Sequence, residues 1–280
     1  MPFEPYISFR KVSANSLDLI DPPVQQPSNA LTRGTNLLLL IHGYNSSVAG
    51  ASESYTGWQS LQNELGGIAN ANVVGVYWPG SNWESVLVYL QAIGKAEQTA
   101  QRLARALHAA AAGFGVLRLS ILTHSLGARV TLNLVERLQK DANPRIQLER
   151  FVVMAAAFPT RFLSPGRPIR QSLDQARTPF LNLYSEADAV LHYAFPLAES
   201  IHGSGFFPTA LGRTKWTGGS AITAPQLTQQ ENTGSGHTTY WYGETGAARA
   251  SALRAGRLAR GYLGLGAVAR ETPTRDTPTR

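Results

Sequence analysis

Three polar residues of this sequence have the types and the chain order of a serine-based catalytic triad. Ser125 lies in "THSLG", Asp188 in "YSEAD" and His237 in "GSGHTTYW". A histidine can take the proton of a serine hydroxyl, and a carboxylate can orient that imidazole and stabilise its charged form. Together the three residue types turn a weakly reactive hydroxyl into a nucleophile, so the pattern predicts acyl-transfer chemistry at Ser125.

Each of these residues also has a purely structural interpretation. Serine is a preferred helix N-cap, an aspartate after a strand is a common turn residue, and a histidine in a glycine-rich loop is often a surface residue. Glu186 is the alternative acid. The alternative bases are His192 and His202, which lie between the candidate acid and His237.

The residues around Ser125 favour a sharp turn from a strand into a helix. Such a turn exposes the serine oxygen, but it crowds the positions two residues before and two residues after the serine. Gly127 is small, whereas Thr123 is bulkier than the usual glycine. We therefore interpret "THSLG" as a variant of the Gly-x-Ser-x-Gly nucleophile elbow.

A second motif, "LLLLIHGYNSS", supplies a candidate oxyanion hole. Glycine after an early strand lets the backbone approach the nucleophile, so the N–H of Tyr44 can join the N–H of Leu126 in binding an oxyanion. His42 precedes this glycine, and we expect it to support the loop through hydrogen bonds rather than to transfer protons. His124, beside the serine, is expected to face away from it as a wall or sheet contact.

The hydrophobic pattern of the sequence predicts the strands and helices that position these candidate residues. Short apolar runs alternate with longer helical patterns, which is typical of a mostly parallel sheet with helices on both faces. Apolar residues at consecutive positions indicate strands covered on both sides. The expected strands are 36–44, 72–80, 117–123, 150–158 and 178–188, and the expected helices are 55–66, 83–112 and from Ser125 to about Lys140.

The chain length favours a single domain over residues 1–265. The segment "PYISFRKV" is expected to add an antiparallel edge strand, and residues 266–280, without apolar packing residues in "RETPTRDTPTR", are expected to form a disordered tail. Residues 189–236 form a long connection, which we interpret as a lid or binding loop. Its candidate apolar inner face consists of Phe195, Phe206, Phe207 and Trp216.

Composition narrows the possible partners. The net charge of +7 is concentrated from Arg249 onward, where seven arginines and two acidic residues supply five of the seven charges. We interpret this basic region as the solvated face of a terminal helix, so neither nucleic-acid binding nor attachment to a membrane surface is expected. Without cysteines there is no disulfide or thiolate site, and no spacing suggests a metal or a cofactor. The absence of a signal-like or membrane-spanning segment favours the cytoplasm.

The sequence resembles the α/β-hydrolase superfamily, and more narrowly the bacterial group DUF900. The motifs that carry the resemblance are "IHGYNSS", "VYWPGS", "THSLGARV", "YSEADAVL" and "GHTTYW", which span residues 41–241. The resemblance implies an α/β-hydrolase fold and the triad named above, but no substrate. Only about twenty residues separate the strands at 150–158 and 178–185, so we expect no large cap domain.

The expected activity is that of a serine hydrolase, specifically a carboxylesterase for short- to medium-chain acyl esters. One alternative is a lipase or phospholipase acting at a membrane surface, and another is a non-catalytic binding protein on the same fold. Candidate substrate-binding residues are His42, Trp78, Phe206 and Trp241. The sequence leaves the natural substrate and the oligomeric state open.

Overall fold

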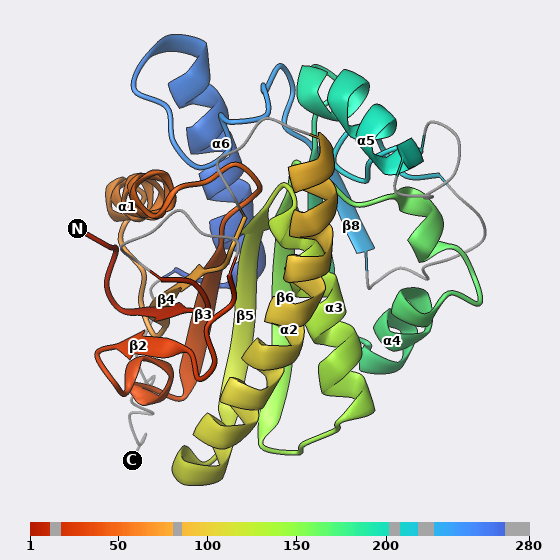
Figure 1. Ribbon diagram of the computed structural model, residues 1–280. Coiled ribbons are helices and arrows are strands. Elements are labelled where there is room, and N and C mark those ends of the chain that lie inside the picture. Colours follow the sequence, from red (N-terminus) through yellow and green to blue (C-terminus); the bar gives the residue numbers. More distant parts are fainter. Residues whose placement is uncertain (12–17, 81–85, 202–207, 218–226, 267–280) are drawn as a thin grey trace, which may run out of the picture.

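The computed structural model describes residues 1–11, 18–80, 86–201, 208–217 and 227–266 (Figure 1). Within these residues, eight strands form one sheet in the order β2-β1-β4-β3-β5-β6-β7-β8. Neighbouring strands are parallel except at the edge, where β2 runs antiparallel to β1. The strands are β1 (Tyr6–Ser8), β2 (Val24–Gln26), β3 (Asn36–Ile41), β4 (Asn72–Tyr77), β5 (Leu117–His124), β6 (Ile146–Met154), β7 (Phe180–Tyr184) and β8 (Leu227–Glu231).

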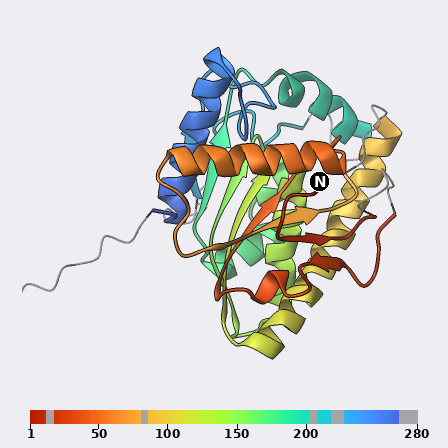
Figure 2. The same ribbon diagram turned by 90° about the vertical axis from the view of Figure 1, so that its left-hand side faces the viewer.

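Helices cover both faces of the sheet, as expected. Helices α2 and α3 pack together on one face with α4 beside α3, while α1 and α6 lie against each other on the opposite face (Figures 1 and 2). The helices are α1 (Val48–Glu64), α2 (Val86–Phe114), α3 (Gly127–Lys140), α4 (Pro168–Ala176), α5 (Phe195–Ile201) and α6 (Gly246–Leu263). Shorter helical turns are η1 (Ala30–Thr32), η2 (Thr160–Leu163) and the π-helical η3 (Val190–Ala194).

The central strands are buried on both faces, which explains their continuous apolar runs. Residues Leu37–Ile41 of β3 are all buried, and β7 is buried along its whole length. A strand covered on both sides must be apolar at odd and even positions alike. The predicted fold class, an α/β hydrolase fold with a mostly parallel sheet, is therefore confirmed.

The N-terminal prediction is wrong in one respect. Strand β1 pairs in parallel with β4, and the antiparallel edge strand is β2, residues 24–26. The sequence pattern indicated that an edge strand exists near the N-terminus. The direction of that strand depends on the path of the chain before it, and a three-residue strand does not encode this path.

Residues 189–236, interpreted from the sequence as a lid or binding loop, contain helices and a strand that the sequence analysis did not predict. The first part of this range is helical as η3 and α5, and the last part contains β8, which pairs in parallel with β7. The segment "LTQQE" lacks the apolar run of the other strands because it lies at the sheet edge. Phe206, Phe207 and His202 lie outside the described residues, as do 267–280 of the expected tail.

The parallel arrangement brings the chemistry of the chain to one edge. β3 ends before His42, β5 ends at the residue before Ser125, β7 ends shortly before Asp188, and β8 ends six residues before His237. The carboxyl ends of parallel strands share one edge of the sheet. Among the described residues, no helix is long and apolar enough to cross a membrane.

Candidate active site

Ser125, His237 and Asp188 form one hydrogen-bonded chain at the carboxyl edge of the sheet. The Nε2 atom of His237 lies 2.8 Å from the Oγ atom of Ser125. Its Nδ1 atom lies 2.8 Å from Oδ2 of Asp188. These distances allow the imidazole to take the serine proton while the carboxylate holds Nδ1–H. The structure thus brings together the three residues that the chain order predicted.

The backbone around Ser125 has the conformation of a nucleophile elbow. Ser125 has a φ of 54°, a left-handed conformation that is uncommon for residues other than glycine. The end of β6 holds it there, because the Ser125 N–H donates to the Met154 carbonyl at 2.9 Å and the Ala157 N–H donates to the Ser125 carbonyl at 3.1 Å. Such strain persists only where neighbouring contacts fix the backbone.

The threonine that departs from the usual elbow has its own role. The Thr123 hydroxyl donates to the Ile41 carbonyl of the neighbouring strand at 3.2 Å, so the side chain tucks between β5 and β3. A Cβ at Gly127 would lie 2.6 Å from this hydroxyl oxygen and 2.5 Å from the His42 carbonyl. The elbow therefore accommodates threonine at position 123 because the glycine at position 127 has no side chain to collide with it.

Asp188 is held so that one carboxylate oxygen faces the histidine. Its side chain is fully buried, and its other oxygen, Oδ1, accepts a hydrogen bond from the Leu191 N–H at 3.0 Å. The turn that follows β7 is fixed by the Asp188 N–H, which donates to the Ser185 carbonyl at 3.1 Å. Glu186, the alternative acid, is exposed.

The loop that carries His237 is tied to its surroundings by polar contacts. Asn232 and Ser235, both fully buried, bond to Ser251 of α6: the Asn232 amide donates to the Ser251 carbonyl at 3.3 Å, and the two serine hydroxyls share a short hydrogen bond. The Nε2 atom of His124 lies 2.7 Å from the carbonyl oxygen of His237. Sequence reasoning did not identify Asn232, Ser235 or Ser251 as loop supports.

The alternative bases do not fit this arrangement. The Nδ1 atom of His192 accepts a hydrogen bond from Nε of Arg213 at 2.9 Å, and its side chain is exposed on η3. His202 lies outside the described residues. Of the described histidines, His237 is the one whose ring bonds to Ser125.

The candidate oxyanion hole lies beside the nucleophile. A Cβ at Gly43 would lie 2.7 Å from the Ser125 Cβ, so glycine is required for the approach of this backbone to the serine. Tyr44 follows this glycine and lines the cavity, and Leu126 follows the serine and is fully buried. The two residues predicted to supply the oxyanion-hole amides therefore directly follow the two residues of this close approach, Gly43 and Ser125.

His42 supports the oxyanion loop, as the sequence suggested. Its Nδ1 donates to the Gly43 carbonyl at 2.8 Å, and its Nε2 accepts from the Trp78 N–H at 3.3 Å. Burial lowers the pKa of His42 to about 3, which keeps the ring neutral for both bonds. From the residues that follow β1, Arg10 adds a further support by donating to the Ser46 carbonyl at 3.0 Å.

Trp78 does not have the substrate-binding position that we expected. Its ring stacks on His42 with centroids 5.6 Å apart and its Nε1 donates to the His42 carbonyl, so the side chain is fully buried behind that residue. Trp241, by contrast, lines the cavity, as does His42. The remaining candidate, Phe206, lies outside the described residues.

A cavity of about 500 Å³ opens beside the triad. Its volume is in the range of sites for small organic molecules. Ser125 and His237 are on its wall. Most of the other wall residues are apolar or aromatic, and they include Tyr44, Tyr89, Ala157, Leu191, Phe195, Ala198 and Trp241. The expected apolar inner face is therefore present at Phe195, whereas Trp216 packs against the core.

A buried ion pair lies behind Tyr89 of the cavity wall, and the sequence did not reveal it. An Nη atom of Arg129, one turn after the nucleophile, lies 2.5 Å from Oε1 of Glu199 on α5, and both side chains are almost completely buried. The Tyr89 hydroxyl donates to the same oxygen at 3.0 Å. Burial, followed by the charge of Glu199, raises the pKa of Tyr89, so its hydroxyl keeps this proton.

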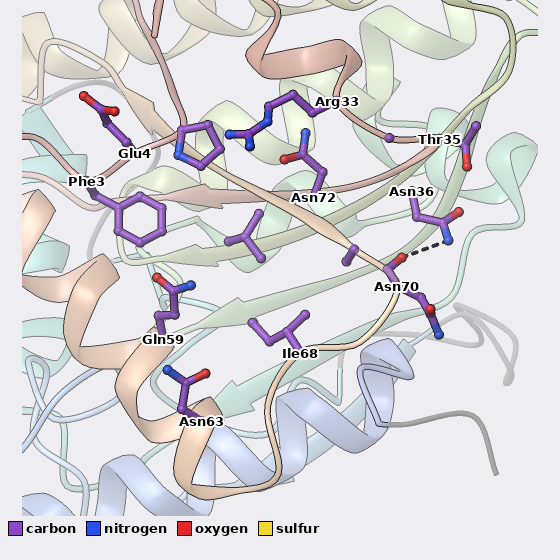
Figure 3. A pocket seen from close by; sticks show the side chains of 14 residues that line it. Phe3, Glu4, Arg33, Thr35, Asn36, Gln59, Asn63, Ile68, Asn70 and Asn72 are labelled. Atoms are coloured by element: carbon purple, nitrogen blue, oxygen red, sulfur yellow. Dashed lines mark hydrogen bonds between the residues drawn. The ribbon is translucent and has the colours of Figure 1, made fainter. Parts of the chain in front are cut away.

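A second cavity, of about 660 Å³, lies near the amino ends of β3 and β4, away from the triad (Figure 3). Amide side chains dominate its wall, including Asn36, Gln59, Asn63 and Asn72. The Asn36 amide is occupied by a hydrogen bond to the Asn70 carbonyl at 2.9 Å. No serine or histidine is among the described residues that line it, so this cavity does not hold a second serine–histidine pair.

The described residues contain no group of histidine and carboxylate side chains that could hold a metal ion. The sheet, the helices on both faces and the elbow serine at its carboxyl edge define the chain as an α/β hydrolase. It belongs to the family described as alpha/beta hydrolase of unknown function (DUF900), whose model matches residues 28–192.

Solved structures with the same fold are distant in sequence. A Thermoplasma acidophilum protein described as a predicted CIB-like hydrolase shares 16% identity with a TM-score of 0.44, covering 82% of this chain and 87% of that one. MenH from S. aureus shares 12% identity with a TM-score of 0.45, covering 83% and 94%. A gene product of Listeria innocua shares 12% with a TM-score of 0.48, covering 82% and 94%. No curated protein sequence matches this chain.

Proposed function

We propose that this α/β hydrolase is a serine carboxylesterase that cleaves short- to medium-chain acyl esters. The single observation that supports this proposal most is the continuous hydrogen-bonded chain Ser125–His237–Asp188, with both links at 2.8 Å, on the wall of an apolar cavity. Neither link alone would distinguish a catalytic residue from a structural one.

The reaction follows from these positions. The Ser125 oxygen attacks the acyl carbon while its proton passes to Nε2 of His237, and Asp188 stabilises the imidazolium. The amides of Tyr44 and Leu126 bind the oxyanion of the tetrahedral intermediate. His237 then donates the proton to the departing alkoxide, which leaves an acyl-enzyme and an alcohol. Water repeats the sequence and releases the carboxylic acid.

The cavity favours an acyl group of modest length. Its apolar wall, with Phe195, Ala198 and Leu191 opposite the nucleophile's polar partners, gives hydrocarbon a place out of water. A volume of about 500 Å³ accommodates a small ester. No step of this reaction needs a cofactor or a metal.

Hydrolysis of p-nitrophenyl esters with acyl chains of increasing length tests the proposal. We expect turnover with a preference for short to medium chains, and a loss of several powers of ten in Ser125→Ala. Ser60→Ala, which alters an exposed serine of α1, is the matched control and should retain full activity. If Ser125→Ala folds normally and keeps more than a tenth of the turnover, the nucleophile is a different group.

If the folded wild-type protein hydrolyses no ester of the series, the carboxylesterase proposal is wrong. A non-catalytic protein on this fold is then favoured, and binding of an uncleaved ester analogue to the cavity would support it. Loss of a triad member would have pointed to such a protein, but the three residues are present and in contact.

A further inference from the structure

The segment from η3 through α5 has an apolar face on each side. Its inner face covers the cavity beside the triad, with Leu191, Phe195 and Ala198 all buried. Figure 1 shows α5 next to the first turns of α2, and the two helices are in contact. A surface helix normally places polar side chains on the face opposite the core.

The outer face of this segment is apolar instead. Val190, Tyr193, Leu197 and Ile201 are 46%, 68%, 55% and 63% exposed, and they recur three or four residues apart, on adjacent helical turns. We call these four side chains the outer apolar face. Large exposed apolar side chains that gather in one place mark contact sites rather than ordinary surface.

The outer apolar face carries no charged side chain of its own segment. Between residues 189 and 201 the only aspartate, glutamate, lysine or arginine is Glu199, and its carboxylate is buried against Arg129. Besides Arg129, a second cationic side chain bonds to this segment, since Nε of Arg213 donates to Nδ1 of His192. The four side chains of the outer apolar face themselves offer apolar surface and no charge, so we expect burial of apolar surface to dominate binding to this face.

The size of the face argues against a second copy of the chain as its occupant. A large side chain has on the order of 200 Å² of surface, so four that are about half exposed offer roughly 400 Å². A stable dimer buries about 800 Å² on each partner. A lipid surface sets no such minimum, because a few apolar side chains can insert singly between acyl chains.

The outer apolar face is also continuous with the cavity. Val190 and Ala194 are exposed and are also on the wall of the cavity, so these two apolar side chains belong both to the outside of the segment and to the cavity that holds Ser125. An acyl chain that leaves a lipid surface at this point can reach the nucleophile without crossing water.

We propose that the outer apolar face docks on a lipid surface without net charge and delivers the acyl chains of water-insoluble esters to the cavity. This inference rests on the proposed carboxylesterase activity for its substrate, but the docking itself does not require turnover. It assigns the surface contact to residues 190–201 and not to the basic helix α6. Three of the four arginines of α6 bond within the protein: Arg249 pairs with Glu64, Arg254 donates to the Thr233 carbonyl and Arg260 donates to the Gly67 carbonyl.

Co-sedimentation with phosphatidylcholine vesicles tests the docking. The probe protein is Ser125→Ala, which prevents hydrolysis, and the test variant adds Tyr193→Gln, Leu197→Gln and Ile201→Gln, none of which lines the cavity. The control adds Phe114→Gln and Val116→Gln, which are 42% and 43% exposed at the opposite edge of the sheet. We expect the test variant to bind at least tenfold more weakly and the control to bind normally.

Salt and lipid charge separate this proposal from an electrostatic one. Binding that depends on apolar burial should persist when salt is raised from about 0.05 to about 0.5 M, since screening affects only charges. Binding that requires anionic phosphatidylglycerol and disappears at high salt would overturn the proposal. Light scattering provides a further arm: a wild-type dimer that the triple substitution dissociates would assign the face to a second copy.

Kinetics in the wild-type background distinguish failure of the docking from failure of the activity. Below its solubility limit, p-nitrophenyl butyrate should be hydrolysed equally by the wild type and the triple variant. Above the limit of a longer ester, the wild-type rate should rise and the variant's rate should stay at least tenfold lower. Equal rates on the emulsion would overturn the docking alone, whereas absence of turnover on both substrates would overturn the proposed function.

Discussion

The Nε2 atom of His124 lies 2.7 Å from the backbone carbonyl oxygen of His237, so the residue beside the nucleophile holds the loop of the histidine that contacts the nucleophile. Because a carbonyl only accepts, Nε2 of His124 must carry a proton. Burial, followed by the proximity of His237, lowers the pKa of His124 to about 3 and keeps that ring neutral. We interpret His124 as a positioning residue for His237.

Removal of this contact should affect turnover more than binding. His124→Leu loses the donor, and one hydrogen bond is worth about 1 kcal/mol, so we expect kcat to fall about fivefold with KM for a short ester unchanged. His124→Gln keeps a donor and should restore most of the rate. Steady-state kinetics of both variants provide the check, and equal kcat values for Leu and Gln would show that the hydrogen bond has no positioning role.

The elbow glycine should be intolerant of even one methyl group. In Gly127→Ala the new Cβ would meet the His42 carbonyl at 2.5 Å, so we expect a loss of at least about 2 kcal/mol of stability, together with ester hydrolysis. A Cβ added at Gly94 of α2 would have no neighbouring atom within 4 Å, and Gly94→Ala should stabilise by about 0.5–1 kcal/mol. Urea unfolding compares the two variants; similar stability changes would contradict this view of the elbow.

The buried ion pair between Arg129 and Glu199 should show strong coupling. Glu199→Leu leaves an unpaired buried guanidinium, which costs about 3–5 kcal/mol. The double variant Arg129→Met, Glu199→Leu removes both charges and should recover most of that loss. A double-mutant cycle by urea unfolding measures the coupling. Additive effects of the two substitutions would mean that the pair contributes nothing as a pair.

Stability should decrease in acid because of the buried neutral histidines. The pKa of His42 is about 3 in the folded protein against 6.5 for the free side chain, so below pH 6.5 the unfolded chain binds the proton more readily. The contribution of neutral His42 to the free energy of unfolding should thus be fully present above pH 6.5. It should fall as the pH drops toward 3, by at most about 1.4 kcal/mol per pH unit. Urea unfolding at several pH values should give a shallower slope for His42→Gln, and parallel slopes would refute the assignment.

The fold and the three triad positions could be predicted because they depend on local patterns and on one geometric rule. Continuous apolar runs specify parallel strands, and parallel strands bring their carboxyl ends together, so Ser125, Asp188 and His237 meet at one edge. Other features of the fold depend on where a strand lies in the sheet, which the sequence pattern does not reveal. Strand β8 is polar because it lies at the edge, and nothing local distinguishes it from a loop.

Contacts between distant elements could not be predicted. Arg129 and Glu199 are seventy positions apart on two helices, and a single sequence gives no signal that they pair. Trp78 is a residue type that often lines cavities. Its burial results from stacking on His42, which depends on the three-dimensional path of two loops. Thr123 departs from the usual elbow motif, and the sequence does not indicate that its hydroxyl donates a hydrogen bond to the Ile41 carbonyl.

Mapping of the site that reacts with a fluorophosphonate tests most directly that Ser125 is activated by His237 and Asp188. The reagent attacks serines whose hydroxyl is activated, and mass spectrometry of the digested protein identifies the modified residue. We predict one phosphonylated site, Ser125, with labelling at least a hundredfold slower in His237→Ala and normal in His192→Ala. Labelling of another residue, or equally fast labelling of Ser125 in the His237→Ala protein, would contradict this activation.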